Sequence, residues 1–255
     1  YVHGGDGSDN LFLLDGVPIY QVSHLGGLFS SFNTDVIENI DFYKSGFPAR
    51  FGGKMSSVVD ITTRDGNFYD YHGTFAIGLI DGHLQFEGPI VKGKTSFNVG
   101  LRRTWIETIS EPILYFFNKE NQPDKLTLGY SFSDLNAKVT HKFSPKYTLR
   151  GSFYMGRDVF RYKQYNFSEY YQVGEDGVAE IHRQQENDMG IPMNWGNTLG
   201  SLDWKWDISD RLSMNAAAYY TRSHSRLGFY FEDWTCLHPD VRERGGQYVN
   251  SLVHD

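Results

Sequence analysis

Apolar and polar residues alternate along most of the chain beyond about residue 66. Leu135, Ala137 and Val139 alternate with polar neighbours, and Trp204 and Trp206 alternate with charged ones. Because successive side chains of a β-strand point to opposite faces of a sheet, this period of two predicts strands with one apolar face. The pattern, bounded by turn residues, predicts about seven strands, at 71–80, 83–90, 95–105, 129–143, 147–160, 196–208 and 211–226.

The connections between these strands are of two kinds, short turns and long polar segments that we expect to be loops. The turns lie at 92–94, 144–146 and 209–210, and the expected loops at 106–128, 161–195 and from 227 onward. The strands are about ten residues or longer, as a tilted strand needs to cross a bilayer. Short turns at one end and long loops at the other are typical of outer-membrane barrels. The pattern therefore predicts an all-β transmembrane antiparallel β-barrel, and a soluble β-sandwich is the alternative.

The predicted number of strands is odd, whereas bacterial single-chain barrels have an even number and leave no open edge in lipid. We therefore expect the first part of a larger barrel, within an internal piece of a longer protein. Trp204 and Trp206 precede a short turn and are expected in the periplasmic aromatic girdle. The side chains expected to face lipid are Leu135, Ala137, Val139, Trp204, Trp206, Leu212, Met214, Ala216 and Ala218.

Residues 1–66 have a different character, with glycine-rich turns and short mixed segments that suit a small α+β domain. The segments 11–14 and 58–62 are of this mixed kind, and the apolar residues before Asp15-Gly16 predict a strand that ends in a turn. A helix is predicted to start within 33–38, because Asn33 or Thr34 can cap it and acidic side chains are favoured in a first turn. We therefore expect two parts, an N-terminal domain at 1–66 and a barrel part at 67–255.

Composition agrees with strands and excludes several functions. Aromatic residues make up 16% of the chain and its formal net charge is -7, so no overall cationic field is present to hold nucleic acid. The single cysteine, Cys236, excludes an intrachain disulfide framework. The nine histidines show no metal-ligand spacing, and a calcium-type nonapeptide at 4–12 occurs only once. No catalytic motif is present, so we expect no enzyme activity, cofactor or metal.

Four segments of the N-terminal part carry a specific resemblance. They are LLDGVPIY at 13–20, HLGGLF at 24–29, DVIE at 35–38 and YKSGFPARFGGKMSSVVDITTR at 43–64. In this order they resemble the C-terminal half of the plug domain of TonB-dependent outer-membrane receptors, in the form common among Bacteroidetes. The resemblance covers about residues 4–66 and extends through GPI at 88–90 into the first barrel hairpins.

This resemblance implies a receptor of about 22 strands whose lumen is closed by the plug. It implies a place in the cell outer membrane of a Gram-negative bacterium and import of a scarce nutrient, such as a siderophore, haem, cobalamin, oligosaccharide or peptide. The implied partners are outer-membrane lipid, the TonB complex through a plug N-terminus outside this chain, and the small-molecule, glycan or peptide ligand. A surface lipoprotein is a further candidate. Two rival functions stay open, a non-transporting outer-membrane scaffold and a soluble carbohydrate-binding β-sandwich.

We expect ligand contact at an outward apex of the plug, residues 20–33, and at the loop 161–195. Aromatic rings with a few polar groups suit sugars, haem or aromatic siderophores. The candidate ligand residues are Tyr20, His24, Phe29, Phe32, Asn33, Tyr162, Tyr165, Tyr170 and Tyr171. Arg50 and Arg64 are candidate latches between plug and barrel. An enclosed guanidinium needs a carboxylate, so at least one of them should pair with an acid on an inward strand face.

Overall fold

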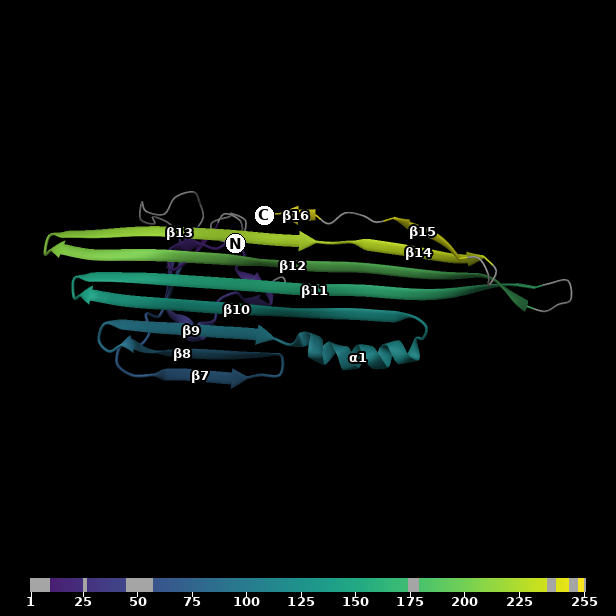
Figure 1. Ribbon diagram of the computed structural model, residues 1–255, viewed down its shortest axis with the longest axis horizontal. Helices are drawn as coiled ribbons and strands as arrows, with labels where there is room; N and C mark the ends of the chain where they lie inside the picture. The colour runs from purple at the N-terminus through teal and green to yellow at the C-terminus, as the bar shows by residue number, and fades with distance from the viewer. Residues whose placement is uncertain are drawn as a thin grey trace. The chain divides into compact units, whose positions relative to one another are not determined.

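A computed structural model of the chain describes residues 10–24, 27–44, 57–173, 179–237, 242–247 and 252–254 (Figure 1). These residues are mostly in β-strands, with one α-helix, α1 (Ile106–Glu120), and one 3-10 helix, η3 (Thr34–Val36). Within the described ranges no helix is long and apolar enough to cross a membrane.

The chain divides into two compact units. The first unit comprises Tyr1–Thr104, Phe132–Asp158 and Gly196–His224. The second unit comprises Trp105–Ser131, Val159–Trp195 and Ser225–Asp255. The longest strands contribute residues to both units, and each unit is described by itself below.

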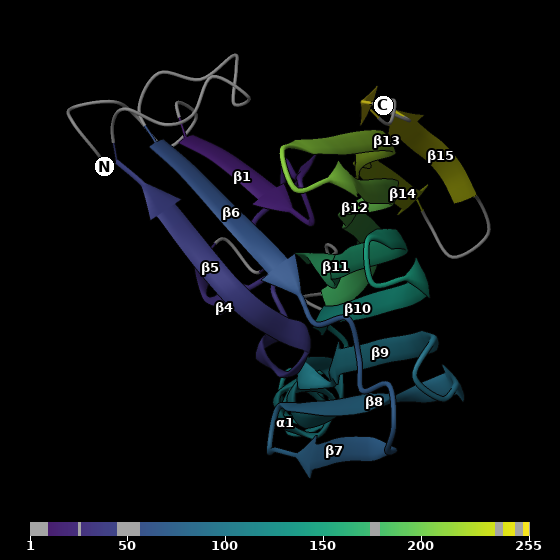
Figure 2. The same ribbon diagram turned by 90° about the vertical axis from the view of Figure 1, so that its left-hand side faces the viewer.

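A four-stranded sheet forms the N-terminal part of the first unit (Figure 2). Its strands, in spatial order, are β2 (Val17–Pro18), β1 (Asn10–Leu14), β6 (Ser57–Thr63) and β5 (Ile37–Tyr43). β1 and β6 run parallel, and β5 is antiparallel to β6. A small separate sheet pairs β3 (Ser23–His24) with β4 (Phe29–Ser30). The strand predicted before Asp15-Gly16 is thus confirmed as β1, and the mixed segment 58–62 forms most of β6. We call the described residues from 10 to 65 the N-terminal domain.

The helix predicted from residue 33 is a single 3-10 turn. Asn33 does cap it, since its side-chain oxygen accepts a hydrogen bond from the main-chain N–H of Asp35 at 3.1 Å. The chain then enters β5, whose residues Ile37, Ile40 and Phe42 favour strands. Pairing of β5 with β6 satisfies the main-chain groups that a longer helix would otherwise satisfy. Strand pairing therefore overrides the local helix signal.

A ten-stranded sheet holds the remaining strands. Its main path runs β15-β14-β12-β11-β10-β9-β8-β7, and β13 pairs with β12 and β16. The strands predicted from alternation are confirmed, and each predicted short turn joins two of them. The bounds are β7 (His72–Ile77), β8 (Asp81–Val91), β9 (Thr95–Thr104), β10 (Lys125–Ser144), β11 (Tyr147–Val173), β12 (Ala179–Ser209), β13 (Leu212–Leu227), β14 (Tyr230–Leu237), β15 (Arg242–Gln247) and β16 (Leu252–His254).

The prediction of three long loops is wrong. The segment 106–128 consists mainly of α1 and the start of β10, and most of 161–195 belongs to β11 and β12. Beyond residue 227 the chain forms β14, β15 and β16. Alternation does not reveal these strands because polar residues occupy both of their faces, so no apolar side marks the period. On one face of β11, for example, Tyr162 donates to Gln164 at 2.6 Å and Gln164 donates to Asn166 at 3.1 Å.

In the first unit, the two faces of the strands differ as the alternation predicts. On β10, Asp134, Asn136 and Lys138 are buried, whereas Val139 is 44% exposed. We call the side of these three polar residues the inner face and the opposite side the outer face. The remaining residues expected to face lipid are at least partly exposed: Leu135, Ala137, Trp204, Trp206, Leu212, Met214, Ala216 and Ala218. Lipid contact itself stays a prediction.

The N-terminal domain packs on the inner face through a shared apolar core. Leu14, Val17 and Ile61 of the domain form one buried cluster with Tyr154 of β11 and Leu199 of β12. Buried apolar side chains stabilise a fold in proportion to the area they remove from water. Because the strands complete this core, the domain is held on the inner face by packing as well as by the polar contacts described next.

Candidate functional site

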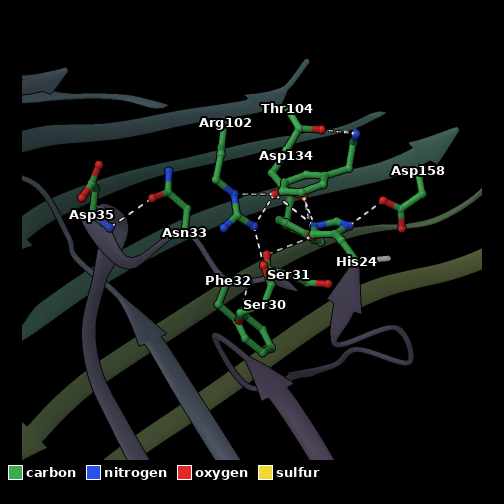
Figure 3. Close-up of polar contacts among 12 residues, drawn as sticks. His24, Ser30, Ser31, Phe32, Asn33, Asp35, Arg102, Thr104, Asp134 and Asp158 are labelled. Carbon is green, nitrogen blue, oxygen red and sulfur yellow. Dashed lines mark hydrogen bonds and ion pairs between the residues drawn. The ribbon is translucent and has the colours of Figure 1, made fainter. Parts of the chain in front are cut away.

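His24, at the end of β3, is buried against the inner face of the strands (Figure 3). Its Nδ1 lies 2.7 Å from Oδ1 of Asp158 on β11, and its Nε2 lies 3.0 Å from Oδ1 of Asp134 on β10. The ring stacks on Phe132, with centroids 3.9 Å apart and an interplanar angle of 4°. Both ring nitrogens can donate to carboxylates only when the imidazole is protonated. The geometry therefore fits an imidazolium between two carboxylates.

Asp134 is the centre of this cluster. Arg102 on β9 donates to its Oδ2 from Nε at 3.0 Å and from Nη2 at 2.7 Å. The Tyr154 hydroxyl is 3.1 Å from its Oδ1 and 3.2 Å from the main-chain oxygen of Ser31. Arg102 also donates to the main-chain oxygen of Ser30. One carboxylate thus organises contacts from three strands to the segment around β3 and β4. We call His24, Arg102, Asp134, Tyr154 and Asp158 the histidine cluster.

The charges in the histidine cluster determine the protonation of His24. Burial by itself would lower the pKa of His24. Its hydrogen bonds to Asp134 and Asp158, together with their negative charges, outweigh burial and raise the pKa above the ordinary value of 6.5. With Arg102 the cluster then holds two cations and two anions. Pairing of opposite charges offsets part of the cost of removing these groups from water.

The docking of the N-terminal domain should depend on pH through His24. A group whose pKa is raised in the folded state stabilises that state fully below its unfolded pKa, which is near 6.5 for histidine. This stabilisation is lost as the pH rises through the folded-state pKa. We expect amide exchange of residues 27–36, corrected for intrinsic rates, to accelerate above pH 6.5. The His24→Asn variant should lose this dependence. His141→Asn should keep it, because His141 contacts Thr95 of a neighbouring strand. Protection that increases with pH would contradict the assignment.

A second cluster joins two aspartates of the N-terminal domain to cations on the strands. Nζ of Lys138 is 3.0 Å from Oδ1 of Asp15 and 2.7 Å from the main-chain oxygen of Thr63. It is also 3.4 Å from Oδ1 of Asp65, and Arg150 on β11 donates to the same oxygen from Nε at 3.0 Å. We call Asp15, Asp65, Lys138 and Arg150 the lysine cluster. It links the ends of β1 and β6 to β10 and β11.

Local structure places both aspartates of the lysine cluster. Asp15 starts the turn between β1 and β2 with a φ of 49° and accepts hydrogen bonds from the N–H and hydroxyl of Thr63, at 3.0 and 2.6 Å. Burial by itself would raise the pKa of Asp65, but the hydrogen bond from Arg150 and the charges of Lys138 and Arg150 lower it below its ordinary value. Asp65 is therefore ionised at neutral pH, as the ion pairs require.

One amide and one glycine complete the interface. The side chain of Asn197 on β12 accepts from the N–H of Gln21 at 3.3 Å and donates to the carbonyl of Gln21 at 2.8 Å. On β9, Gly100 lies directly under η3, where an added Cβ would be 2.4 Å from Cγ1 of Val36. A larger residue at position 100 would therefore push η3 away from the strand.

The interface has little free space. A cavity of about 10 Å³ lies between Asp15, Lys138 and Tyr154, among other residues. This volume suits about one water molecule and is too small for a nutrient ligand. Across the part of the chain that the structure describes, no group of three His, Cys, Asp or Glu side chains could hold a metal ion. The arrangement is thus a docking interface rather than a binding pocket.

The candidate ligand residues of the N-terminal domain mostly serve this docking. His24 and Asn33 are buried, and the Phe29 ring lies 5.5 Å from the ring of Phe132. Phe32 packs against the shared core. Tyr20 is the one of the five with a largely exposed side chain, at 67%. Sequence reasoning treated aromatic and polar groups as ligand contacts because it could not show which strands lie against them. Ligand contact by this segment stays a prediction.

The four candidate tyrosines of the segment 161–195 lie on β11 and not in a loop. The Tyr162 hydroxyl donates to Gln164, and the exposed Tyr171 donates to Glu169 at 2.7 Å. The Arg183 guanidinium lies over the ring of Tyr170, 4.3 Å from its centroid. Tyr165 lines a shallow depression with Lys125 and Lys163, among other residues. These tyrosines belong to the second unit, and their role in ligand binding stays a prediction.

The charged contacts of the lysine cluster have the opposite polarity to the predicted latches. Arg50 lies outside the described residues. Arg64 donates to the main-chain oxygen of Asp35, within the N-terminal domain, and not to a strand carboxylate. In the lysine cluster the acids come from the domain and the cations, Lys138 and Arg150, come from the strands. The sequence analysis did not name Lys138, Arg150 and Asp134 as docking residues. The alternation could have indicated them, because it places all three on the inner face.

Neither a protein-family model nor a curated protein matches the chain. Among solved structures it is similar to the siderophore receptor PirA from Acinetobacter baumannii, with 12% identity, 97% of this chain and 52% of that chain covered, and a TM-score of 0.38. It is also similar to two mutants of the ferric enterobactin receptor PfeA from Pseudomonas aeruginosa. The first is 14% identical, with 96% of this chain and 51% of that chain covered and a TM-score of 0.36. The second is 13% identical, with 94% of this chain and 51% of that chain covered and the same TM-score. The chain thus spans about half the length of these receptors.

Proposed function

We propose that the chain is part of a TonB-dependent outer-membrane receptor, in which the N-terminal domain is the plug and the strands are the first part of the barrel wall. The observation that carries this proposal is the contrast between the two faces of one sheet. The inner face holds buried charges that bind the N-terminal domain, and the outer face is apolar and exposed. A barrel wall needs this contrast when its inner face binds a plug through polar contacts and its outer face is in contact with lipid.

Apolar residues of the outer face form rows across neighbouring strands. Phe75 of β7 is paired with Leu84 of β8, Leu84 with Leu101 of β9, and Leu101 with Leu135 of β10. Phe75, Leu84 and Leu101 are exposed. A continuous exposed apolar surface is unfavourable in water and favourable in hydrocarbon. A soluble β-sandwich would cover this surface with a second sheet, and no other described sheet is paired or packed there.

Aromatic rings gather near the short turns of the first unit. The rings of Phe143 and Tyr147 are 4.5 Å apart, and Trp204 and Trp206 lie 5.5 and 6.3 Å from Tyr147. Trp204 and Trp206 are exposed on the outer face. Tryptophan and tyrosine favour the boundary between lipid and water. This cluster supports a periplasmic girdle next to the short turns.

In this proposal the complete receptor lies in the cell outer membrane of a Gram-negative bacterium and has no catalytic role. It imports a scarce nutrient, such as a siderophore, haem, cobalamin, oligosaccharide or peptide, using force from the TonB complex. The motif at residues 43–64 supports a Bacteroidetes-type receptor, for which a surface lipoprotein is a candidate partner. The non-transporting scaffold is the rival that a transport experiment can separate.

A disulfide between η3 and β9 tests whether the plug must move for import. A Cβ added at Gly100 would lie 3.7 Å from Cβ of Val36, within the range of a disulfide. The full-length receptor, with Val36→Cys, Gly100→Cys and every native cysteine, including Cys236, changed to Ser, is expressed in cells. Cells are then offered a labelled ferric catecholate siderophore, haem, cobalamin, maltooligosaccharide and peptide in turn. We expect uptake of one probe to fall to background after oxidation and to return after reduction.

A matched disulfide between two strands is the control for this experiment. Ala137 of β10 is paired with Val99 of β9 on the outer face, so Ala137→Cys with Val99→Cys joins the strands without holding the N-terminal domain. Oxidation of this control should leave uptake unchanged. Equal uptake by the oxidised and reduced η3–β9 variant would contradict plug movement. Surface binding of a probe without uptake in every form would favour the scaffold.

A further inference from the structure

α1 is attached to β10 by polar side chains, within the second unit (Figure 1). Ser110 donates from its hydroxyl to the main-chain oxygen of Leu128 at 3.0 Å. Asn118 donates to the main-chain oxygen of Leu126 at 2.9 Å and accepts from its N–H at 2.7 Å. The Asn118 amide thus satisfies the two main-chain groups that a neighbouring strand would otherwise pair. The side of α1 that carries Ser110 and Asn118 is therefore occupied by the sheet.

The side of α1 next to the one that faces the sheet carries a stripe of large apolar residues. Ile109, Ile113, Phe116 and Phe117 follow the i, i+4, i+7, i+8 spacing that places side chains on one helix face. Ile113 and Phe116 are each 65% exposed, and Phe117 is 50% exposed. We call these four residues the α1 stripe. Tyr115 lies outside the stripe, at i+4 from Glu111, although its ring is 5.7 Å from the ring of Phe116.

The surroundings of the α1 stripe fit a lipid surface. Glu111 and Lys119 are exposed and lie away from the stripe, whereas the exposed Glu120, at i+4 from Phe116, ends the stripe with a charge. Apart from this last residue, α1 has an apolar and a charged side, as helices in the lipid–water interface do. The chain enters α1 directly from β9, whose outer-face residue Leu101 belongs to the rows proposed to contact lipid. Beyond the helix, a depression of about 530 Å³ is lined by Lys125 and by Lys163, which also pairs with Asp188 at 3.0 Å. Lysines at this place suit lipid phosphates.

We propose that α1 lies in the lipid–water interface of the membrane, with the α1 stripe in the boundary of the acyl chains and Lys125 close to the headgroup phosphates. This inference rests on the proposed function, because it needs a strand wall inserted in lipid. Aromatic side chains are stable at this boundary, where one part of the ring meets hydrocarbon and another meets water. α1 thereby anchors the connection between β9 and β10, while its Asn118 side covers the edge of β10 at Leu126.

Spin labels at single cysteines test this placement in the full-length receptor reconstituted into vesicles of phosphatidylethanolamine and phosphatidylglycerol. Every native cysteine, including Cys236, is replaced by Ser, and labels are placed at Phe116, Lys119 and Val139. Collision with oxygen reports lipid, and collision with a water-soluble nickel chelate reports water. We expect oxygen to dominate at Phe116 and the nickel chelate to dominate at Lys119. All three positions are exposed, and heat-modifiable migration checks that each variant folds.

Val139, on the outer face of β10, is the reference that separates the two proposals. Dominant oxygen collisions at Val139 with dominant nickel collisions at Phe116 would overturn the placement of α1 and leave the receptor proposal intact. Dominant nickel collisions at Val139 would overturn the receptor proposal itself. Weak collisions with both reagents at Phe116, with dipolar broadening between labels, would show a second copy of the chain on the stripe and would also overturn the lipid placement.

Discussion

Asp134→Ala is expected to weaken the docking of the N-terminal domain by about 3–5 kcal/mol, the cost of breaking a buried ion pair by removing one partner. Asp134 accepts from Arg102 and from His24, and its side chain is fully enclosed. Without it Arg102 loses its carboxylate partner, His24 keeps only Asp158, and the Tyr154 hydroxyl loses one acceptor. The loss is larger than that of an ordinary hydrogen bond, which contributes about 0.5–1.5 kcal/mol.

Amide hydrogen exchange of the full-length protein measures this effect. We expect faster exchange in residues 29–36, next to the carbonyls of Ser30 and Ser31 that contact the histidine cluster. Asp210→Ala is the control, because Asp210 belongs to an exposed ion pair with Lys146 at 3.6 Å, and such pairs contribute little. Unchanged exchange in the Asp134 variant would show that apolar packing alone holds this segment.

Lys138→Met is expected to weaken the docking by a similar amount, about 3–5 kcal/mol, but at a different place. Methionine keeps much of the volume of the lysine stem and removes the ammonium, so Asp15 loses its cation and the carbonyl of Thr63 loses a donor. Asp65 keeps Arg150. Faster exchange is therefore expected in residues 11–18 and 57–63. Lys205→Met, which removes an exposed lysine 3.9 Å from Asp207, is the matched control.

The two variants together test whether the clusters act independently. Asp134 and Lys138 are four residues apart on β10, about 13 Å at about 3.3 Å per residue. Substitutions more than about 7–10 Å apart without shared partners are usually additive. The double variant should therefore lose about 6–10 kcal/mol of docking, comparable with the stability of many domains. An effect no larger than that of either single variant would show that the clusters release the domain as one unit.

The sequence by itself determined the strands of the first unit, their two faces and the short turns between them. These features depend on neighbouring residues, since a strand side chain at position i shares its face with i+2. Leu135, Ala137 and Val139 therefore separate from Asp134, Asn136 and Lys138 before any partner strand is known. The same reasoning missed the end of β11 after residue 160 and the beginning of β12 before residue 196. Polar residues occupy both faces of these segments, so no apolar side marks the period of two. The sequence reasoning also predicted a helix at residue 33, where pairing of β5 with β6 decides the conformation.

Only the tertiary structure decided which inner-face residues meet which part of the N-terminal domain. His24 contacts Asp134 and Asp158, which are 110 and 134 residues away along the chain, and Lys138 contacts Asp15, which is 123 residues away. Periodicity shows that a side chain points inward, but its partner depends on strand order, register and the path of the domain across the sheet. For that reason the sequence suggested arginines of the domain as latches. In the structure, aspartates of the domain bind cations on the strands, and His24 is a docking residue held between two carboxylates.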